Sequence, residues 1–158
     1  LANNMASYKT APMVPEVYSD TRTHSGSTDY LLTDVVIVGI GEGRFPAPLT
    51  RKLWVAPHMR STDGNTATIR VSLCKLWPQG DSLSDALLVE PYVSATFTTT
   101  STTFVTPTAL DLDVRHLNQS PGPFGGVGFL CIELKKGGSS NVEYDGLSLC
   151  RLGPLVAP

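Results

Sequence analysis

Charge is the scarcest feature of this 158-residue chain, because Asp, Glu, Lys and Arg supply only 16% of it. Soluble proteins usually carry about 25% of these residues. The formal net charge is −2, so the chain has no general attraction for phosphate backbones or anionic membrane surfaces. Long hydrophobic runs are also missing, and none approaches the roughly 20 residues of a membrane-spanning helix. We therefore expect no nucleic-acid partner and no membrane partner.

Cysteine is scarce as well. Cys74, Cys131 and Cys150 each lie in an apolar, strand-like stretch without Cys-x-x-Cys spacing, and an odd number leaves at least one thiol unpaired. If the last two apolar stretches form a hairpin around Gly137-Gly138, Cys131 faces roughly position 146 and not Cys150. The sequence thus predicts three buried, reduced thiols. A zinc site is the alternative, but clustered ligands for it are lacking.

Sequence motifs for cofactors do not occur in the chain. An apolar stretch ends in glycines at 39, 41 and 43, but Arg44 stands where a dinucleotide-binding turn needs its third glycine. Pro46 and Pro48 then disfavour the helix whose amino terminus would hold a pyrophosphate. We predict no cofactor.

Catalytic spacings are also missing. His24, His58 and His116 are far apart in the sequence, and neither a Gly-x-Ser-x-Gly turn nor a metalloprotease helix pattern occurs. We expect that the protein is not an enzyme. The alternative is a fold that brings a histidine beside Asp111 or Asp113, as a hydrolase would need.

Three aspartates raise the question of calcium. Asp111, Asp113 and Asp145 carry the oxygen ligands that calcium prefers. Asp111 and Asp113 alternate with apolar residues, however, and this alternation favours solvent-facing positions that keep an edge strand from pairing promiscuously. We predict no metal site.

Threonine is what the chain has in abundance, above all in a run from 95 to 106 that alternates with Ala, Phe and Val. Threonine is β-branched, and a period of two places alternate side chains on opposite faces of a sheet. The sequence therefore predicts an all-β fold, an antiparallel β-sandwich and specifically a jelly roll of about eight strands. The expected strands are 30–39, 49–56, 66–77, 91–99, 102–106, 109–115, 127–135 and 142–152.

The domain organisation follows from the same pattern. Residues 1–29 are rich in Pro, Ser and Thr with little periodicity, and we interpret them as an extended N-terminal arm or a loosely held leading strand. Residues 30–158 form the single β-sandwich domain. One short helix is expected at 82–88, where Ser82 is a suitable cap and Leu83, Ala86 and Leu87 share a face.

Aromatic residues are the candidates for contact with partners. Trp54 alternates with Leu53 and Val55, so it points outward if those two are buried, and the opposite assignment is equally open. Trp77 shares its parity with the apolar set of the preceding strand, so we expect it in the core. The interface or ligand-stacking candidates are Trp54, Tyr92 and Tyr144.

In general style the chain resembles the jelly-roll structural proteins of virus and bacteriophage particles, including capsid, decoration and head-fibre proteins. The resemblance rests on residues 92–114, 126–134 and 144–152, about a quarter of the chain, and it transfers no functional residue. It implies a capsid-associated virion protein, of decoration, cement or shell type, assembled in the host cytoplasm. Its partners would be copies of itself, as a homotrimer, and other virion proteins.

Carbohydrate-binding jelly rolls have a similar closing strand. The alternative function is therefore a carbohydrate-binding or host-recognition module of a fibre or an extracellular protein, with a glycan as its ligand.

Overall fold

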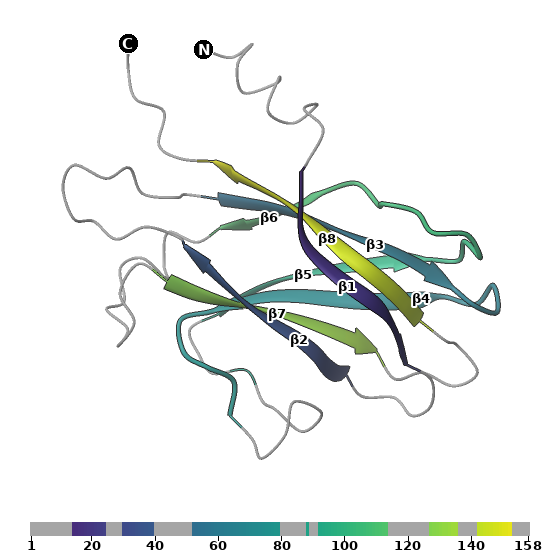
Figure 1. Ribbon diagram of the computed structural model, residues 1–158, viewed down its shortest axis with the longest axis horizontal. Coiled ribbons are helices and arrows are strands. Elements are labelled where there is room, and N and C mark those ends of the chain that lie inside the picture. Colours follow the sequence, from purple (N-terminus) through teal and green to yellow (C-terminus); the bar gives the residue numbers. More distant parts are fainter. Residues whose placement is uncertain are drawn as a thin grey trace, which may run out of the picture.

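The computed structural model contains two four-stranded antiparallel sheets packed against each other, consistent with a β-sandwich (Figure 1). It describes residues 14–24, 30–39, 52–79, 88, 92–113, 127–135 and 142–152. Within these ranges every regular element is a strand and no helix occurs. The all-β prediction is confirmed.

The strand bounds match the expected ranges at 30–39, 127–135 and 142–152 and within one residue at 91–99, but they differ by up to five residues elsewhere. The strands are β1 (Val14–His24), β2 (Tyr30–Gly39), β3 (Lys52–Ser61), β4 (Ala67–Cys74), β5 (Tyr92–Thr99), β6 (Leu110–Asp113), β7 (Val127–Lys135) and β8 (Val142–Leu152).

The strand order is β1-β8-β3-β6 in one sheet and β2-β7-β4-β5 in the other. Four of the antiparallel pairs join strands whose numbers add up to nine, namely β1 with β8, β2 with β7, β3 with β6 and β4 with β5. These pairs alternate between the two sheets along the chain. The first half of the protein is thus laid against the second half in reverse order.

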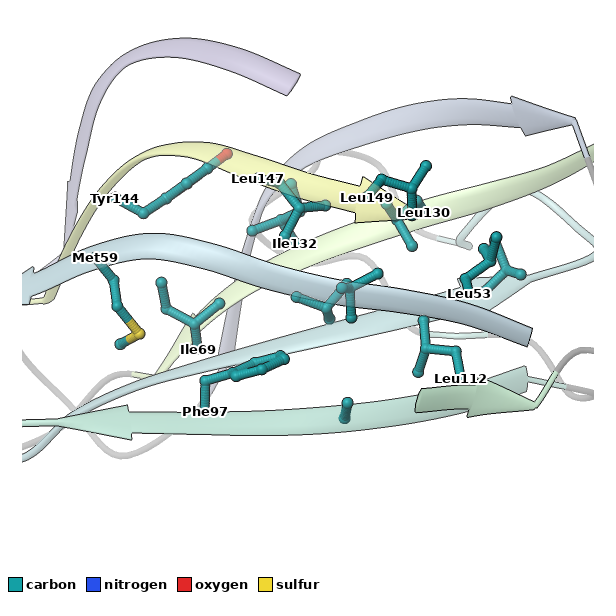
Figure 2. Close-up of a cluster of buried hydrophobic side chains, with 14 of the residues drawn as sticks. Leu53, Met59, Ile69, Phe97, Leu112, Leu130, Ile132, Tyr144, Leu147 and Leu149 are labelled. Carbon is teal, nitrogen blue, oxygen red and sulfur yellow. The ribbon is translucent and has the colours of Figure 1, made fainter. Parts of the chain in front are cut away.

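The core lies between the sheets and is built by strict alternation. In β4, Ile69, Val71 and Leu73 are fully buried, and their cross-strand neighbours in β7 include Ile132 and Leu130. Leu53, Met59 and Leu147 come from the opposite sheet, as Figure 2 shows. At roughly 25 cal/mol per Å² of apolar area removed from water, this layer is the main stabilising term of the fold.

The threonine-rich run does not form two strands as expected. Its first part is β5, but 102–106 is irregular, and its backbone pairs with β3 only through an isolated bridge between Val105 and Met59. The side chain of Ser101 donates to the carbonyl of Thr103, and the hydroxyl of Thr99 accepts from the amide of Ser101. Such local bonds compete with a sheet ladder. The chain uses this segment to pass from one sheet to the other.

The amino-terminal prediction also changes. Residues 14–24 form β1, which pairs with β8, so the interpretation as a leading strand holds for them and the sandwich begins before residue 30. Residues 1–13 lie outside the described ranges. The segment 82–88, where a helix was expected, also lies outside them except for Leu88.

The expected hairpin of the last two strands is wrong. β7 pairs with β2 and β4, whereas β8 pairs with β1 and β3 in the other sheet. Each is a central strand, so the connection after β7 crosses from sheet to sheet.

Candidate functional site

The aromatic residues singled out from the sequence do not form a common surface. Tyr144 is fully buried in the core beside Met59 (Figure 2), because the alternation of β8 turns it inward. Trp54 lies on the face opposite Leu53 yet is only 5% exposed. Tyr92 is half-buried and packs against Cys74 and Cys131. Tyr144 and Trp54 therefore have no free ring face for a ligand, and Tyr92 has at most part of one.

Trp77 corrects a sequence prediction. It was expected in the core but is 46% exposed, because β4 ends at Cys74 and the alternation does not continue beyond it. Its ring meets Phe129 edge-on, with centroids 5.3 Å apart and an interplanar angle of 79°. The exposed tryptophan of the described chain is thus Trp77 and not Trp54.

An apolar patch forms around Trp77 on the outer face of the β2-β7-β4-β5 sheet. Phe129 of β7 lies directly opposite Ile37 of β2, and Ile37 is 65% exposed. We call Ile37, Phe129 and Trp77 the apolar patch, of which Ile37 and Trp77 are exposed and Phe129 is buried. Large aliphatic and aromatic side chains exposed together are typical of contact surfaces.

The opposite end of the same outer face is polar. Arg70 of β4 donates from Nε to Oε1 and from Nη2 to Oε2 of Glu133 in β7, at 2.9 and 2.8 Å. Its guanidinium also lies 4.0 Å from the ring centroid of Tyr30 in β2. The bonds to Glu133 raise the pKa of Arg70. The Glu133 side chain of this bidentate pair is buried. The pair joins β4 to β7, and the contact of Arg70 with Tyr30 adds β2.

A second charged group lies on the other sheet. His58 and Arg60 of β3 face Asp145 and Glu143 of β8, with Nδ1 of His58 2.6 Å from Oδ1 of Asp145 and Nε of Arg60 2.6 Å from Oε2 of Glu143. Phe104 stacks on His58 with ring centroids 5.0 Å apart, and the Arg60 guanidinium lies 4.9 Å from the same ring. We call these five residues the charged stripe.

A β-bulge creates the charged stripe. The register shifts between His58 and Met59, whose partners in β8 are Gly146 and Tyr144, so Asp145 is the extra residue of β8. A bulge redirects a side chain locally, and glycine in a strand often marks one. The dipeptide Asp145-Gly146 was the available sequence signal, and the sequence interpretation did not use it.

The charged stripe contains the histidine–carboxylate pair that an enzyme would need, but with Asp145 in place of Asp111 or Asp113. Asp111 instead forms an exposed ion pair with Lys52 at 3.3 Å. Phe104 covers one face of the His58 ring, and the contacts of the stripe are those of cross-strand ion pairs, each worth under about 1 kcal/mol at such exposure. His24 has no described side chain, and His116 lies outside the described residues.

Cys74 and Cys131 form no disulfide and are fully buried on the outer face of the β2-β7-β4-β5 sheet. The pKa of Cys131 is raised, mainly by hydrogen bonding with the Cys74 thiol and to a smaller extent by burial. The prediction of buried, reduced thiols is confirmed for these two. Cys150 lies in β8, opposite Trp54, and its side chain is not described.

Metal ligands do not gather anywhere in the described ranges, where no group of three or more His, Cys, Asp or Glu side chains could hold an ion. Asp111, Asp113 and Asp145 therefore form no shared site there. None of the described elements is a helix long and apolar enough to cross a membrane.

Comparison with known proteins yields no relative. No family model matches the chain, and neither a curated protein nor a solved structure is significantly similar to it.

Proposed function

We propose that this protein is a structural subunit of a virus particle, a capsid-associated protein of decoration, cement or shell type. It acts by associating with copies of itself and by binding other virion proteins. The proposal includes a jelly-roll topology for the two sheets. It follows the resemblance noted in the sequence, and the strand order is the observation that carries it.

The strand order supports a jelly roll for a simple topological reason. A jelly roll has eight strands in two sheets and is built from two Greek keys. An eight-stranded chain folded as one long hairpin pairs β1 with β8, β2 with β7, β3 with β6 and β4 with β5. When that hairpin wraps around itself, successive pairs fall in alternate sheets. The orders β1-β8-β3-β6 and β2-β7-β4-β5 have this property.

Two further observations support assembly as the mode of action. The apolar patch exposes Ile37 and Trp77 together, and burying such side chains stabilises contacts between subunits. Cys74 and Cys131, which form no disulfide, suit assembly in a reducing cytoplasm. We assign the patch to the contact of a homotrimer, in which each copy places its patch against its neighbour around a three-fold axis.

Light scattering of the purified protein tests this proposal. We expect a particle mass equal to three times the 16.9 kDa chain mass or to a multiple of that value, and a lower mass for Ile37→Asp, since a charge in the patch opposes burial. Thr102→Asp is the matched control, because Thr102 is also exposed but lies outside the patch. A strict monomer at all concentrations would contradict the proposal, and an unchanged mass for Ile37→Asp would contradict the assignment of the patch.

A second candidate function is carbohydrate binding by an extracellular or fibre protein. The exposed ring of Trp77 favours it, because flat aromatic rings stack on sugars and the exposed amide of Gln79 lies close, 3.5 Å from the Trp77 carbonyl. A glycan array followed by titration tests it. Saturable binding that Trp77→Ala abolishes and Thr102→Ala preserves would favour this function over the structural one.

A further inference from the structure

The four edge strands of the two sheets differ in how well they resist pairing with another chain. An edge strand presents unpaired backbone N–H and C=O groups, so it is a template for a further strand. Proteins protect such edges with short strands, bulges, prolines, charges, or charged residues pointing inward. The edges here are β1 and β6 in one sheet and β2 and β5 in the other.

Three of these edges carry protective features. β1 contains Pro15 and has two breaks in its register with β8. β2 has a bulge between Leu32 and Asp34, and the register places Asp34 opposite Ile132, on the core face. β6 is four residues long and includes the exposed Asp111.

β5 carries none of them. Its eight residues pair with eight consecutive residues of β4 without any shift, from Thr99 opposite Ala67 to Tyr92 opposite Cys74. It contains no proline, no glycine and no charged residue. In the described part of the chain, β4 is its only hydrogen-bonded neighbour. β5 is therefore a long, straight and neutral edge.

We infer that β5 is an interface between two copies of this chain, which pair their β5 strands antiparallel about a two-fold axis and join two four-stranded sheets into one of eight strands. The occupant is a second copy because the strand is complementary to itself. Its outer face is entirely hydroxyl-bearing at Ser94, Thr96 and Thr98, while Ala95 and Phe97 are buried on the core face.

In an antiparallel pair, the residue numbers of two opposed residues always add up to the same sum. If that sum is even, the outer face of one strand continues into the outer face of the other, and the core faces are likewise continuous. Ser94 then lies opposite Thr96 or Thr98 of the second copy, and Ala95 lies opposite Ala95 or Phe97. Hydroxyl residues thus meet hydroxyl residues on one face and apolar residues meet on the other. Cross-strand pairs of both kinds stabilise sheets.

This inference rests on the proposed function in one respect, since it names a second contact through which the subunit assembles. The contact at the apolar patch is three-fold, whereas two identical strands that pair antiparallel are related by a two-fold axis. A subunit with both contacts forms a closed hexamer or an extended shell. Strand pairing at β5 would link the trimers.

Charges of either sign introduced at Thr96 test the two-fold contact. Thr96 lies opposite Ser94 of the second copy in one register and opposite Thr96 in the other. In both registers, equal charges at position 96 of the two copies come within about 5 to 8 Å of each other. Thr96→Glu and Thr96→Lys should each weaken the pairing by about tenfold or more, since like charges are forced together. An equimolar mixture of the two variants should restore it, because opposite charges then meet.

The measurement is the mass by light scattering of wild type, each variant, the mixture, and Thr102→Glu as a control of equal charge outside β5. Far-ultraviolet circular dichroism confirms that each variant is folded, and recovery in the mixture also excludes misfolding. Halving of the wild-type mass in both variants, with recovery in the mixture and no change in the control, supports the contact.

The negative outcomes separate the two proposals. If the wild type assembles and both Thr96 variants retain its mass, the β5 contact is overturned while the structural function stands. If the wild type is a monomer, both are overturned. A loss of mass that the mixture fails to restore also overturns pairing between β5 strands.

Discussion

Glu133 and Arg70 are joined by two hydrogen bonds between the central strands β7 and β4, with the carboxylate almost fully buried. Glu133→Gln keeps the side-chain volume but leaves one Arg70 donor opposite an amide that cannot accept from it. We expect a loss of about 1.5–3 kcal/mol in the free energy of unfolding. Asp111→Asn, in an ion pair more than one-third exposed on both sides, should lose at most about 1 kcal/mol. Urea denaturation measures both, and equal losses would contradict the ranking.

Gly128 of β7 lies against the side chain of Leu73 in β4. A Cβ atom at this position would lie 2.9 Å from Cδ1 and 3.3 Å from Cγ of Leu73. Gly128→Ala should therefore destabilise the fold by about 1–3 kcal/mol, as overpacking does in cores. In the double variant with Leu73→Val the loss should be smaller than the sum of the single losses, since the shorter side chain makes room. Additive losses in thermal or urea unfolding would mean that Leu73 is not the obstacle.

Tyr144 buries its hydroxyl in the core, where no hydrogen-bond partner is found for it in the described structure. A buried polar group without a partner opposes folding. Tyr144→Phe should thus leave stability unchanged or raise it by up to about 1–3 kcal/mol, whereas Tyr144→Leu should lower it by leaving a cavity. Differential scanning calorimetry measures both. A clear loss for the phenylalanine variant would show that the hydroxyl is satisfied.

Alkaline pH should weaken the fold through Cys131. The pKa of this thiol is raised in the folded protein, first by hydrogen bonding with Cys74 and then by burial. The unfolded chain releases the proton near its usual pKa of about 8.5, so the stabilisation is complete below that pH and declines above it.

The free energy of unfolding of the wild type should accordingly fall between pH 8 and 10 more steeply than that of Cys131→Ala. Parallel curves for the two proteins would contradict this. The native thiols at 74 and 131 should also react with a thiol reagent only as fast as the protein opens.

Phe104 fastens the irregular segment 100–109 to β3 by stacking on His58 and lying over Arg60. Phe104→Ala should lower stability by about 1–2 kcal/mol, from the aromatic and cation–π contacts together. Hydrogen exchange should accelerate most at the amides of Met59 and Val105, which bond to each other's carbonyls. Thr102→Ala, in the same segment but exposed, should leave these amides protected.

Alternation was sufficient to predict the class and most strands. β7 and β8 have the expected bounds because their apolar residues recur at a period of two and turn residues flank them. The same rule failed at Trp77, since it carries no information on where hydrogen bonding stops. It also failed at 102–106, where hydroxyl side chains bond locally instead of leaving the backbone to a partner strand.

Long-range pairing was beyond the sequence. Nothing local in β7 and β8 distinguishes a hairpin from two central strands of different sheets, because both need apolar, period-two segments. The pairing of His58 with Asp145 depends on the same long-range register together with the bulge at Asp145. The exposed Ile37 lies in a run of four apolar residues. Because no polar residue interrupts this run, the sequence does not show which of its side chains point outward.

The position of β8 has a consequence for biosynthesis. β8 lies between β1 and β3, so β1 has no sheet neighbour until residues 142–152 have left the ribosome. Sequence-distant pairing of this kind makes folding slow. Until β8 has emerged, β1 is unpaired in its sheet and β3 has only β6 beside it, so the partly made chain exposes backbone edges that the finished sheet covers.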